Sequence, residues 1–160
     1  MVKDSAMSEL RESNFMNSVT VIKQLTNEIS VFQFKKLNDP RGDLTASLFR
    51  DFIPFSPVRF FFIKDIPEST IRGEHAHKKC DEFLIALNGA ATVTIDDGTT
   101  QASIRLTEGM GINLPAMTWR TQQEFQDGTT LLAFASLPYE ASDYIRDHKS
   151  FLDIKKTMAT

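Results

Sequence analysis

Residues 72–89 read RGEHAHKKCDEFLIALNG and contain two of the chain's three histidines. His75 and His77 are separated by a single residue. Side chains two positions apart on an extended strand point to the same face, so both imidazoles are expected to face one cavity. Glu82 follows His77, and the apolar run after it ends at Asn88 and Gly89, a hairpin-turn signal. The stretch therefore predicts a strand that carries a paired-histidine site, followed by a second strand.

Short extended segments lie on both sides of this stretch. They are rich in β-branched and aromatic residues, and turn signals such as 38–43 and 96–98 separate them. The expected strands are residues 19–25, 29–34, 44–49, 58–63, 91–95, 100–106, 119–125 and 129–135. Residues 139–154 are compatible with a short helix or a docked irregular tail. Nine or ten short strands with no long helix between them predict an all-β antiparallel sandwich or barrel, and the one-domain length favours a jelly roll.

Length and composition limit the other possibilities. A chain of 160 residues suits one domain with a real core, and we expect a flexible N-terminal tail or oligomer arm over 1–18, a single domain over 19–155 and a tail over 156–160. No apolar run is close to the length of a membrane span, which is about 18 residues or more. Cys80 is the only cysteine, so it has no partner for an internal disulfide. With 18 basic and 21 acidic residues there is no basic track for nucleic acid. We expect a cytoplasmic protein with neither membrane nor nucleic-acid partners.

Two spacings resemble the motifs of the cupin superfamily. His75-x-His77-x4-Glu82-x6-Gly89 resembles the first motif, and a segment over 109–120 resembles the second. The resemblance implies the double-stranded β-helix, or cupin jelly roll, with antiparallel strands. In the second motif many cupins place a metal-binding histidine where this chain has Arg120.

This arginine bears on whether a metal binds. A catalytic metal site generally needs three protein ligands, and His75, His77 and Glu82 are one such set. A guanidinium is a permanent cation that does not act as a normal ligand, and placing it beside a divalent ion costs electrostatic energy. We therefore expect no metal and no other cofactor, and we expect the histidines to carry out acid-base chemistry themselves. A metal-dependent cupin enzyme remains an alternative.

A closer resemblance covers residues 38–153. The segments that carry it are RGEHAHKK at 72–79, RGDL at 41–44, IPF at 53–55, Tyr139 and DYIRD at 143–147. Together they resemble the sugar nucleotide 3,4-ketoisomerase family, also called WxcM-like, whose members are metal-independent cupins. The resemblance implies an isomerase that moves the keto group between C4 and C3 of a dTDP-4-keto-6-deoxyhexose. It also implies a place in deoxysugar synthesis for lipopolysaccharide O-antigen or S-layer glycans.

The resemblance also implies roles for individual residues. Moving a ketone from C4 to C3 requires removal of the C3 proton, an enediol(ate), and return of a proton at C4. Histidine titrates near neutral pH, so His77 is expected to be the leading base and His75 its partner. Arg59 and Arg72 are expected to hold negative charge on the enediolate or on the substrate diphosphate. The remaining substrate-binding candidates are Phe61, Lys78, Glu82, Trp119 and Arg120.

Two positions depart from the family pattern. The family commonly offers a tyrosine to the active site from the aromatic strand after Arg59, whereas this chain reads Phe60-Phe61-Phe62 there. The family also usually has a histidine where this chain has Arg120. The departures keep open a shifted substrate, a different stereochemical outcome, or a nucleotide-sugar-binding cupin that does not turn over.

Simpler structural roles stand beside these assignments. The histidine pair and Glu82 are also compatible with structural roles, and Trp119 with a place in the core. Residues 60–62 are expected to be core on one face and site lining on the other, and 143–146 are expected to anchor the tail. Cys80 is expected to be a buried bystander and His148 a solvated surface residue.

Cupins of this kind commonly form dimers in which N-terminal strands cross to the partner sheet. The strands over 19–25 and 29–34 are apolar enough to be exposed edges that need a partner. We therefore expect a homodimer.

Overall fold

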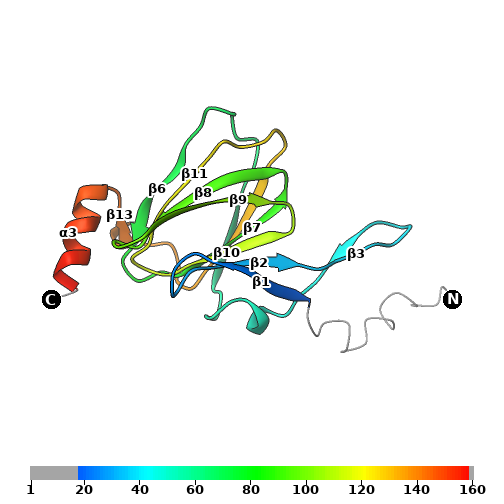
Figure 1. Ribbon diagram of the computed structural model, residues 1–160, viewed down its shortest axis with the longest axis horizontal. Helices are drawn as coiled ribbons and strands as arrows, with labels where there is room; N and C mark the ends of the chain where they lie inside the picture. The colour runs from blue at the N-terminus through cyan, green and yellow to red at the C-terminus, as the bar shows by residue number, and fades with distance from the viewer. Residues whose placement is uncertain (1–17, 159–160) are drawn as a thin grey trace.

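The computed structural model describes residues 18–158, so the tail expected over residues 1–17 lies outside the described residues. Two antiparallel sheets face each other (Figure 1). The six-stranded sheet has the order β1 (Val19–Gln24), β2 (Ser30–Phe34), β10 (Met110–Leu114), β7 (Glu82–Asn88), β12 (Thr130–Ala135) and β5 (Arg59–Ile63). The five-stranded sheet has the order β13 (Tyr144–Ile145), β6 (Arg72–His77), β11 (Trp119–Gln123), β8 (Ala90–Asp96) and β9 (Gln101–Thr107). The predicted all-β antiparallel jelly roll is confirmed.

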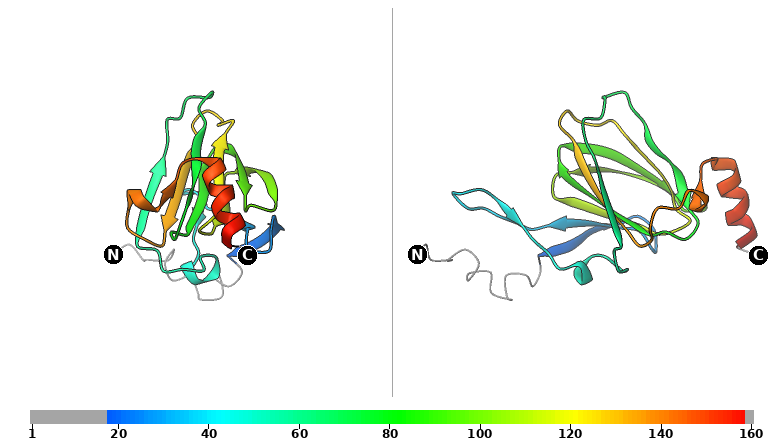
Figure 2. Two further views of the ribbon diagram at one scale, coloured as in Figure 1. Left: turned by 90° about the vertical axis from the view of Figure 1, so that its left-hand side faces the viewer. Right: turned by 180° about the vertical axis from the view of Figure 1, so that it is seen from behind.

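The remaining elements lie at the ends of this body. Strands β3 (Lys36–Leu37) and β4 (Leu44–Thr45) form a hairpin that projects from one end, and α3 (His148–Met158) lies at the other (Figures 1 and 2). Two 3-10 turns, η1 (Phe49–Asp51) and η2 (Ala141–Asp143), complete the fold. The strand predicted over 44–49 is wrong beyond Thr45, because the chain turns into η1 at Phe49. The C-terminal segment is a docked helix, and it runs to Met158.

The main core fills the space between the two sheets. Alternate residues of each strand point inward, as the period of two in the sequence predicted. Leu84 and Ala86 of β7 meet Val93 and Ile95 of β8 in one buried cluster. Each fully buried aliphatic side chain of this size contributes about 1.5–3 kcal/mol to folding. This cluster holds the sheets at the separation that shapes the site between them.

Two smaller clusters lie outside the barrel. Phe34, Phe52 and Phe83 pack on the outer face of the six-stranded sheet. At the other end, Phe151 of α3 is fully buried and packs in one cluster with Ala76 of β6 and with Ile145 of β13. The helix is therefore packed behind the strand that carries the two histidines. Within residues 18–158, no helix has the length and apolar character that crossing a membrane requires.

Candidate functional site

A bulge in β6 sets the position of the histidine pair. Gly73 and Glu74 both have positive φ, and the register with β11 shifts at this point so that Arg120 lies opposite His75. A side chain at Gly73 would bring its Cβ within 2.7 Å of the carbonyl oxygen of Arg120, so glycine is required. The carbonyl oxygen of Gly73 in turn accepts a hydrogen bond of 2.8 Å from Nδ1 of His75. This bond leaves Nε2 of His75 as the unprotonated nitrogen.

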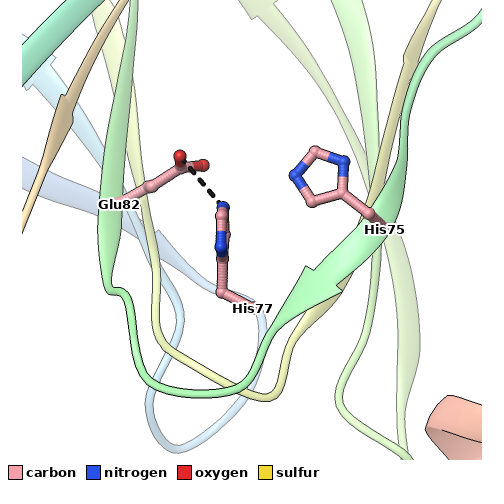
Figure 3. A group of neighbouring side chains, drawn as sticks. All are labelled: His75, His77 and Glu82. Carbon is pink, nitrogen blue, oxygen red and sulfur yellow. Dashed lines mark hydrogen bonds and ion pairs between the residues drawn. The ribbon is translucent and has the colours of Figure 1, made fainter. Parts of the chain in front are cut away.

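His75 and His77 lie on the same face of β6, as their spacing predicted (Figure 3). Their ring centroids are 5.1 Å apart and the rings are nearly perpendicular. His75 is half-buried, whereas His77 is 1% exposed. The two rings therefore share one site between the sheets, and His77 is the more enclosed of the two.

Glu82 joins His77 to two arginines. Its side chain points from β7 toward the histidines, with Oε1 lying 3.2 Å from Nε2 of His77 (Figure 3). Arg120 is 1% exposed and donates a 2.5 Å hydrogen bond from Nη2 to Oε2 of Glu82. Nη2 of Arg59 lies 3.9 Å from Oε1. A buried carboxylate thus stands among two guanidinium groups and an imidazole, which stabilise its charge.

The other nitrogen of His77 contacts the C-terminal segment. Nδ1 of His77 lies 2.9 Å from Oδ2 of Asp143, at the end of η2. Asp143 also accepts hydrogen bonds from the backbone N–H groups of Lys79 at 2.8 Å and Cys80 at 3.3 Å. One carboxylate therefore orients the imidazole and holds the turn between the histidine strand and Glu82. With Nδ1 directed at Asp143, Nε2 is the nitrogen of His77 that remains for chemistry.

The electrostatic surroundings act on both the acid and the base of the site. Burial, and then the Arg120 cation, lower the pKa of His75 to about 4, so this ring is neutral near pH 7. Burial alone would raise the pKa of Glu82, but Arg120 and His77 outweigh it and lower that pKa to about 2. The resting site near pH 7 therefore holds a neutral His75 and an ionised Glu82.

The three candidate metal ligands come together. One ligand atom from each of His75, His77 and Glu82 lies within 4.8 Å of the others. Both oxygens of Glu82 are already engaged, one with His77 and one with Arg120. A divalent ion here would stand beside a fixed guanidinium in a low-dielectric space, which is electrostatically unfavourable. The distances between the ligand atoms of His75, His77 and Glu82 would allow a metal ion to bind, but the charges around them do not favour it.

The structure divides the predicted substrate-binding residues into two groups. Arg59, Phe61, Glu82 and Arg120 lie at the site, and Arg59 stacks over Phe61 at 5.2 Å. Arg72 is exposed at the first residue of β6. The other two predicted residues, Lys78 and Trp119, contact other parts of the chain. Lys78 donates instead to the carbonyl oxygen of Ser142 at 2.7 Å, and Trp119 packs on the opposite face of β11.

The third histidine, His148, lies against Trp119. The centroids of the two rings are 5.0 Å apart. His148 is half-buried and makes a 2.9 Å contact from Nε2 to Oδ2 of Asp96, so it is not the solvated surface residue that was expected. It joins the first residue of α3 to the end of β8.

The phenylalanine run is also different from its prediction. Phe61 faces the inner core, but Phe60 and Phe62 are 64% and 57% exposed, so the outer face of β5 is not core in this chain. Cys80 is buried, as predicted, and its sulfur lies near His77 and Asp143.

Two residues at the site were assigned only to anchoring the tail. Asp143 contacts His77, and the ring of Tyr144 lies 4.3 Å from that of His77 and 4.9 Å from that of His75. The signal that locates them is the DYIRD segment, whose position in space depends on how the tail docks.

Known proteins are similar to this chain in sequence and in fold. Residues 27–156 match the family described as FdtA: WxcM-like, C-terminal. The chain is 36% identical over 125 residues to TDP-4-oxo-6-deoxy-alpha-D-glucose-3,4-oxoisomerase from Aneurinibacillus thermoaerophilus, covering 78% of this chain and 90% of that protein.

Two solved structures have a similar fold. One is a 3,4-ketoisomerase from Helicobacter canadensis, at 33% identity and a TM-score of 0.75, covering 81% of this chain and 98% of that chain. The other is a mutant of the 3,4-ketoisomerase QdtA from Thermoanaerobacterium thermosaccharolyticum in complex with TDP-4-keto-6-deoxyglucose. It is 29% identical with a TM-score of 0.76, covering 82% of this chain and 96% of that chain.

Proposed function

This chain belongs to the WxcM-like, C-terminal family, and on that premise we propose that it is a sugar nucleotide 3,4-ketoisomerase. It moves the keto group between C4 and C3 of a dTDP-4-keto-6-deoxyhexose by proton transfer through an enediol(ate). The relative from Aneurinibacillus thermoaerophilus is named for this reaction on TDP-4-oxo-6-deoxyglucose. The observation that carries the proposal is the histidine pair, two imidazoles with centroids 5.1 Å apart on one face of β6.

The environments of the two imidazoles suit proton transfer at adjacent carbons. His77 is the leading base, because Asp143 holds its Nδ1 and directs Nε2 toward the site. A carboxylate accepts a hydrogen bond from Nε2 only when Nε2 carries a proton, so His77 acts as the base in the form whose Nε2 is unprotonated, with a substrate carbon in place of Glu82 in front of this nitrogen. His75 is neutral and has an unprotonated Nε2, so it is able to accept a proton as the partner of His77.

The arginines supply positive charge where negative charge develops. Arg59 is half-buried at the end of β5 and lies 3.9 Å from Glu82, which places a cation beside the histidines. A fixed cation in a water-poor site stabilises an enediolate as it forms. Arg120 is committed to Glu82 and acts on the site through that carboxylate. Arg72 is exposed at the start of β6, where it suits the diphosphate of the substrate.

The decisive experiment follows the C3 proton of dTDP-4-keto-6-deoxyglucose in deuterated buffer by NMR. The wild-type chain is expected to exchange this proton and to form the 3-keto product. His77→Asn is expected to lose both activities. His148→Asn is the matched control, because it removes the chain's third histidine, which lies against Asp96 rather than at the site. Absence of exchange and product with the wild-type chain would refute the proposal.

The two alternative functions give different results in the same set of measurements. A nucleotide-sugar-binding protein without turnover would bind TDP by calorimetry and leave the C3 proton in place. A metal-dependent cupin enzyme would retain about one metal per chain by elemental analysis after purification without chelator. The engaged oxygens of Glu82 favour the metal-independent reaction.

We also propose that two copies form a homodimer in the cytoplasm and act in deoxysugar synthesis for lipopolysaccharide or another surface glycan. Phe60 and Phe62 project from the outer face of β5, Val58 lies just before this strand, and all three are more than half exposed. Strand β5 is one edge of the six-stranded sheet, and β1, with Val21 and Ile22 exposed, is the other. Exposed apolar edges of this kind favour burial against a second copy. The single unpaired cysteine, Cys80, is in keeping with a reducing compartment.

A further inference from the structure

Tyr144 brings a phenol group to the histidine pair from a part of the chain far away in sequence. Strand β13 pairs with β6 so that Tyr144 lies opposite His77 and Ile145 lies opposite Ala76. The tyrosine ring contacts both imidazoles, with centroids 4.3 Å from His77 and 4.9 Å from His75. Its outer neighbour is Arg146, whose guanidinium lies 4.4 Å from the ring centroid. The tyrosine is half-buried, so it belongs to the site and remains within reach of a bound molecule.

Burial and the Glu82 carboxylate keep the phenol protonated. Burial, and then the Glu82 carboxylate, raise the pKa of Tyr144 above its usual value, while Arg59 acts in the opposite direction. Because both Glu82 and Arg59 affect the pKa of Tyr144, its hydroxyl group lies on the side of the site that holds these two charges. A neutral phenol is both a donor and an acceptor of hydrogen bonds, whereas the carboxylate and guanidinium beside it each offer only one of these functions.

The proposed reaction needs a group of this kind. Two protons move at carbon, one leaving C3 and one arriving at C4, and the histidines account for these. Two more must move at oxygen, because O4 begins as a ketone and ends as a hydroxyl while O3 changes in the opposite sense. Strand β5 cannot do this, since Phe61 has no hydroxyl group and Phe60 and Phe62 face outward.

We propose that Tyr144 is a further catalytic residue, which transfers a proton between O3 and O4 of the sugar. This role rests on the proposed function. As the C3–H bond breaks and its proton passes to a histidine, the electron pair forms the C3–C4 double bond and the Tyr144 O–H bond delivers its proton to O4. The phenolate then takes the O3 proton, C3–O3 becomes the carbonyl, and the histidine returns its proton to C4. Tyr144 ends protonated, and no oxidant or reductant is consumed.

The test is Tyr144→Phe, which keeps the ring against the histidines and removes only the hydroxyl group. Tyr139→Phe is the matched control, because Tyr139 is the chain's other tyrosine, is 61% exposed and has its ring 5.6 Å from that of Tyr144, so it shows whether any hydroxyl group beside the site is enough. Loss of a general acid-base group typically costs about 100-fold or more in rate. We expect such a fall in 3-keto product formation for Tyr144→Phe, with TDP affinity by calorimetry and the thermal unfolding midpoint close to wild type. Tyr139→Phe is expected to keep wild-type activity.

A second readout separates proton transfer from packing. Without the hydroxyl group, a histidine still removes the C3 proton, but the enediolate is trapped before its oxygens exchange a proton. Exchange of the C3 proton with deuterium is therefore expected to fall less than product formation in Tyr144→Phe, so the ratio of exchange to turnover rises. An unchanged rate in this variant, or a loss of exchange, turnover and TDP binding together, would overturn the role of Tyr144 while leaving the ketoisomerase proposal intact. Inactivity of the wild-type chain in both readouts would refute both proposals.

Discussion

The most constrained residue of the site is Glu82, which is 6% exposed and ionised. Arg120 neutralises it, and the same arginine lowers the pKa of His75. Removing one partner of a buried ion pair typically costs about 3–5 kcal/mol, because the other charge is left unpaired. Arg120 therefore does more than replace a metal-binding histidine of the cupin motif. It keeps Glu82 charged, and it adds to the burial that lowers the pKa of His75.

His75 makes the stability of the fold depend on pH. Its pKa is about 4 in the folded chain and near 6.5 in the unfolded chain, so between these values the unfolded chain binds more protons. The free energy of unfolding is therefore expected to fall as the pH decreases from 6.5 toward 4. One proton corresponds to a slope of up to about 1.4 kcal/mol per pH unit, and a half-buried ring contributes less than this bound.

Urea unfolding at pH 7.5, 6.5 and 5.5 measures this slope. The window lies above the range in which Glu82, whose pKa is also depressed, begins to contribute, since protonation of the unfolded carboxyl group begins about one pH unit above its unfolded pKa of 4.5. His75→Asn is expected to flatten the slope, and His148→Asn serves as the comparison. Equal slopes for wild type and His75→Asn would show that the pKa of this ring is not lowered in the folded chain.

At the residue scale, sequence reasoning located the pair but not its supports. The alternation of a strand puts His75 and His77 on one face whatever the rest of the chain does. The partners of His77 are different, because Asp143 is 66 residues away and meets it only after the tail has docked. The surroundings of Trp119 also depend on how the tail docks. Its neighbour Arg120 faces inward, so strand alternation turns Trp119 outward against α3.

Among the elements, β6 determines the geometry of the site through its bulge. The strand gains one residue opposite β11 between Gly73 and His75, which turns the histidines toward Glu82. The sequence shows the glycine, but a bulge depends on the pairing of two strands, so no local pattern predicts it. A strand as short as β13 cannot be predicted either, because two residues show no periodicity. The strand predicted over 44–49 failed at Phe49, where packing against Phe52 and Phe134 favours a turn.

Gly73→Ala tests the bulge. The new Cβ would lie 2.7 Å from the backbone oxygen of Arg120, which cannot move without disturbing β11. We expect a loss of about 1–3 kcal/mol in the free energy of unfolding, measured by urea titration. Gly42→Ala is the matched control, since Gly42 also has positive φ but a Cβ there would meet nothing within 4 Å. If the two variants lost equal stability, backbone strain alone would account for the effect and the contact with Arg120 would be unimportant.

For the whole molecule, the outer face of the six-stranded sheet is packed only in part. It is covered at the cluster of Phe34, Phe52 and Phe83, whereas Phe60, Phe62 and Leu87 are each at least half exposed. A hollow of about 470 Å³ is lined by Leu87, Phe49 and Phe134, among others. Exposed apolar side chains that gather on one face are what a two-fold partner would bury.

Light scattering at micromolar concentration is expected to give twice the 18.1 kDa mass of the chain. Replacing both Phe60 and Phe62 with lysine is expected to give the single-chain mass while leaving the fold intact, because neither ring is part of the core of one chain. Met158→Lys changes an equally exposed apolar residue at the end of α3 and is expected to leave the mass unchanged. A single-chain mass for the wild-type protein would contradict the homodimer.

The docking of the C-terminal segment also affects when a newly synthesised chain becomes competent. Asp143 and Tyr144 reach the histidines only when β13 has paired with β6 and Phe151 has entered its cluster behind that strand. Strands β5 to β12 precede these residues in the chain, so synthesis delivers them before the segment that completes the site. A folding chain can therefore pair most of its two sheets while Asp143 and Tyr144 are still away from the histidine pair.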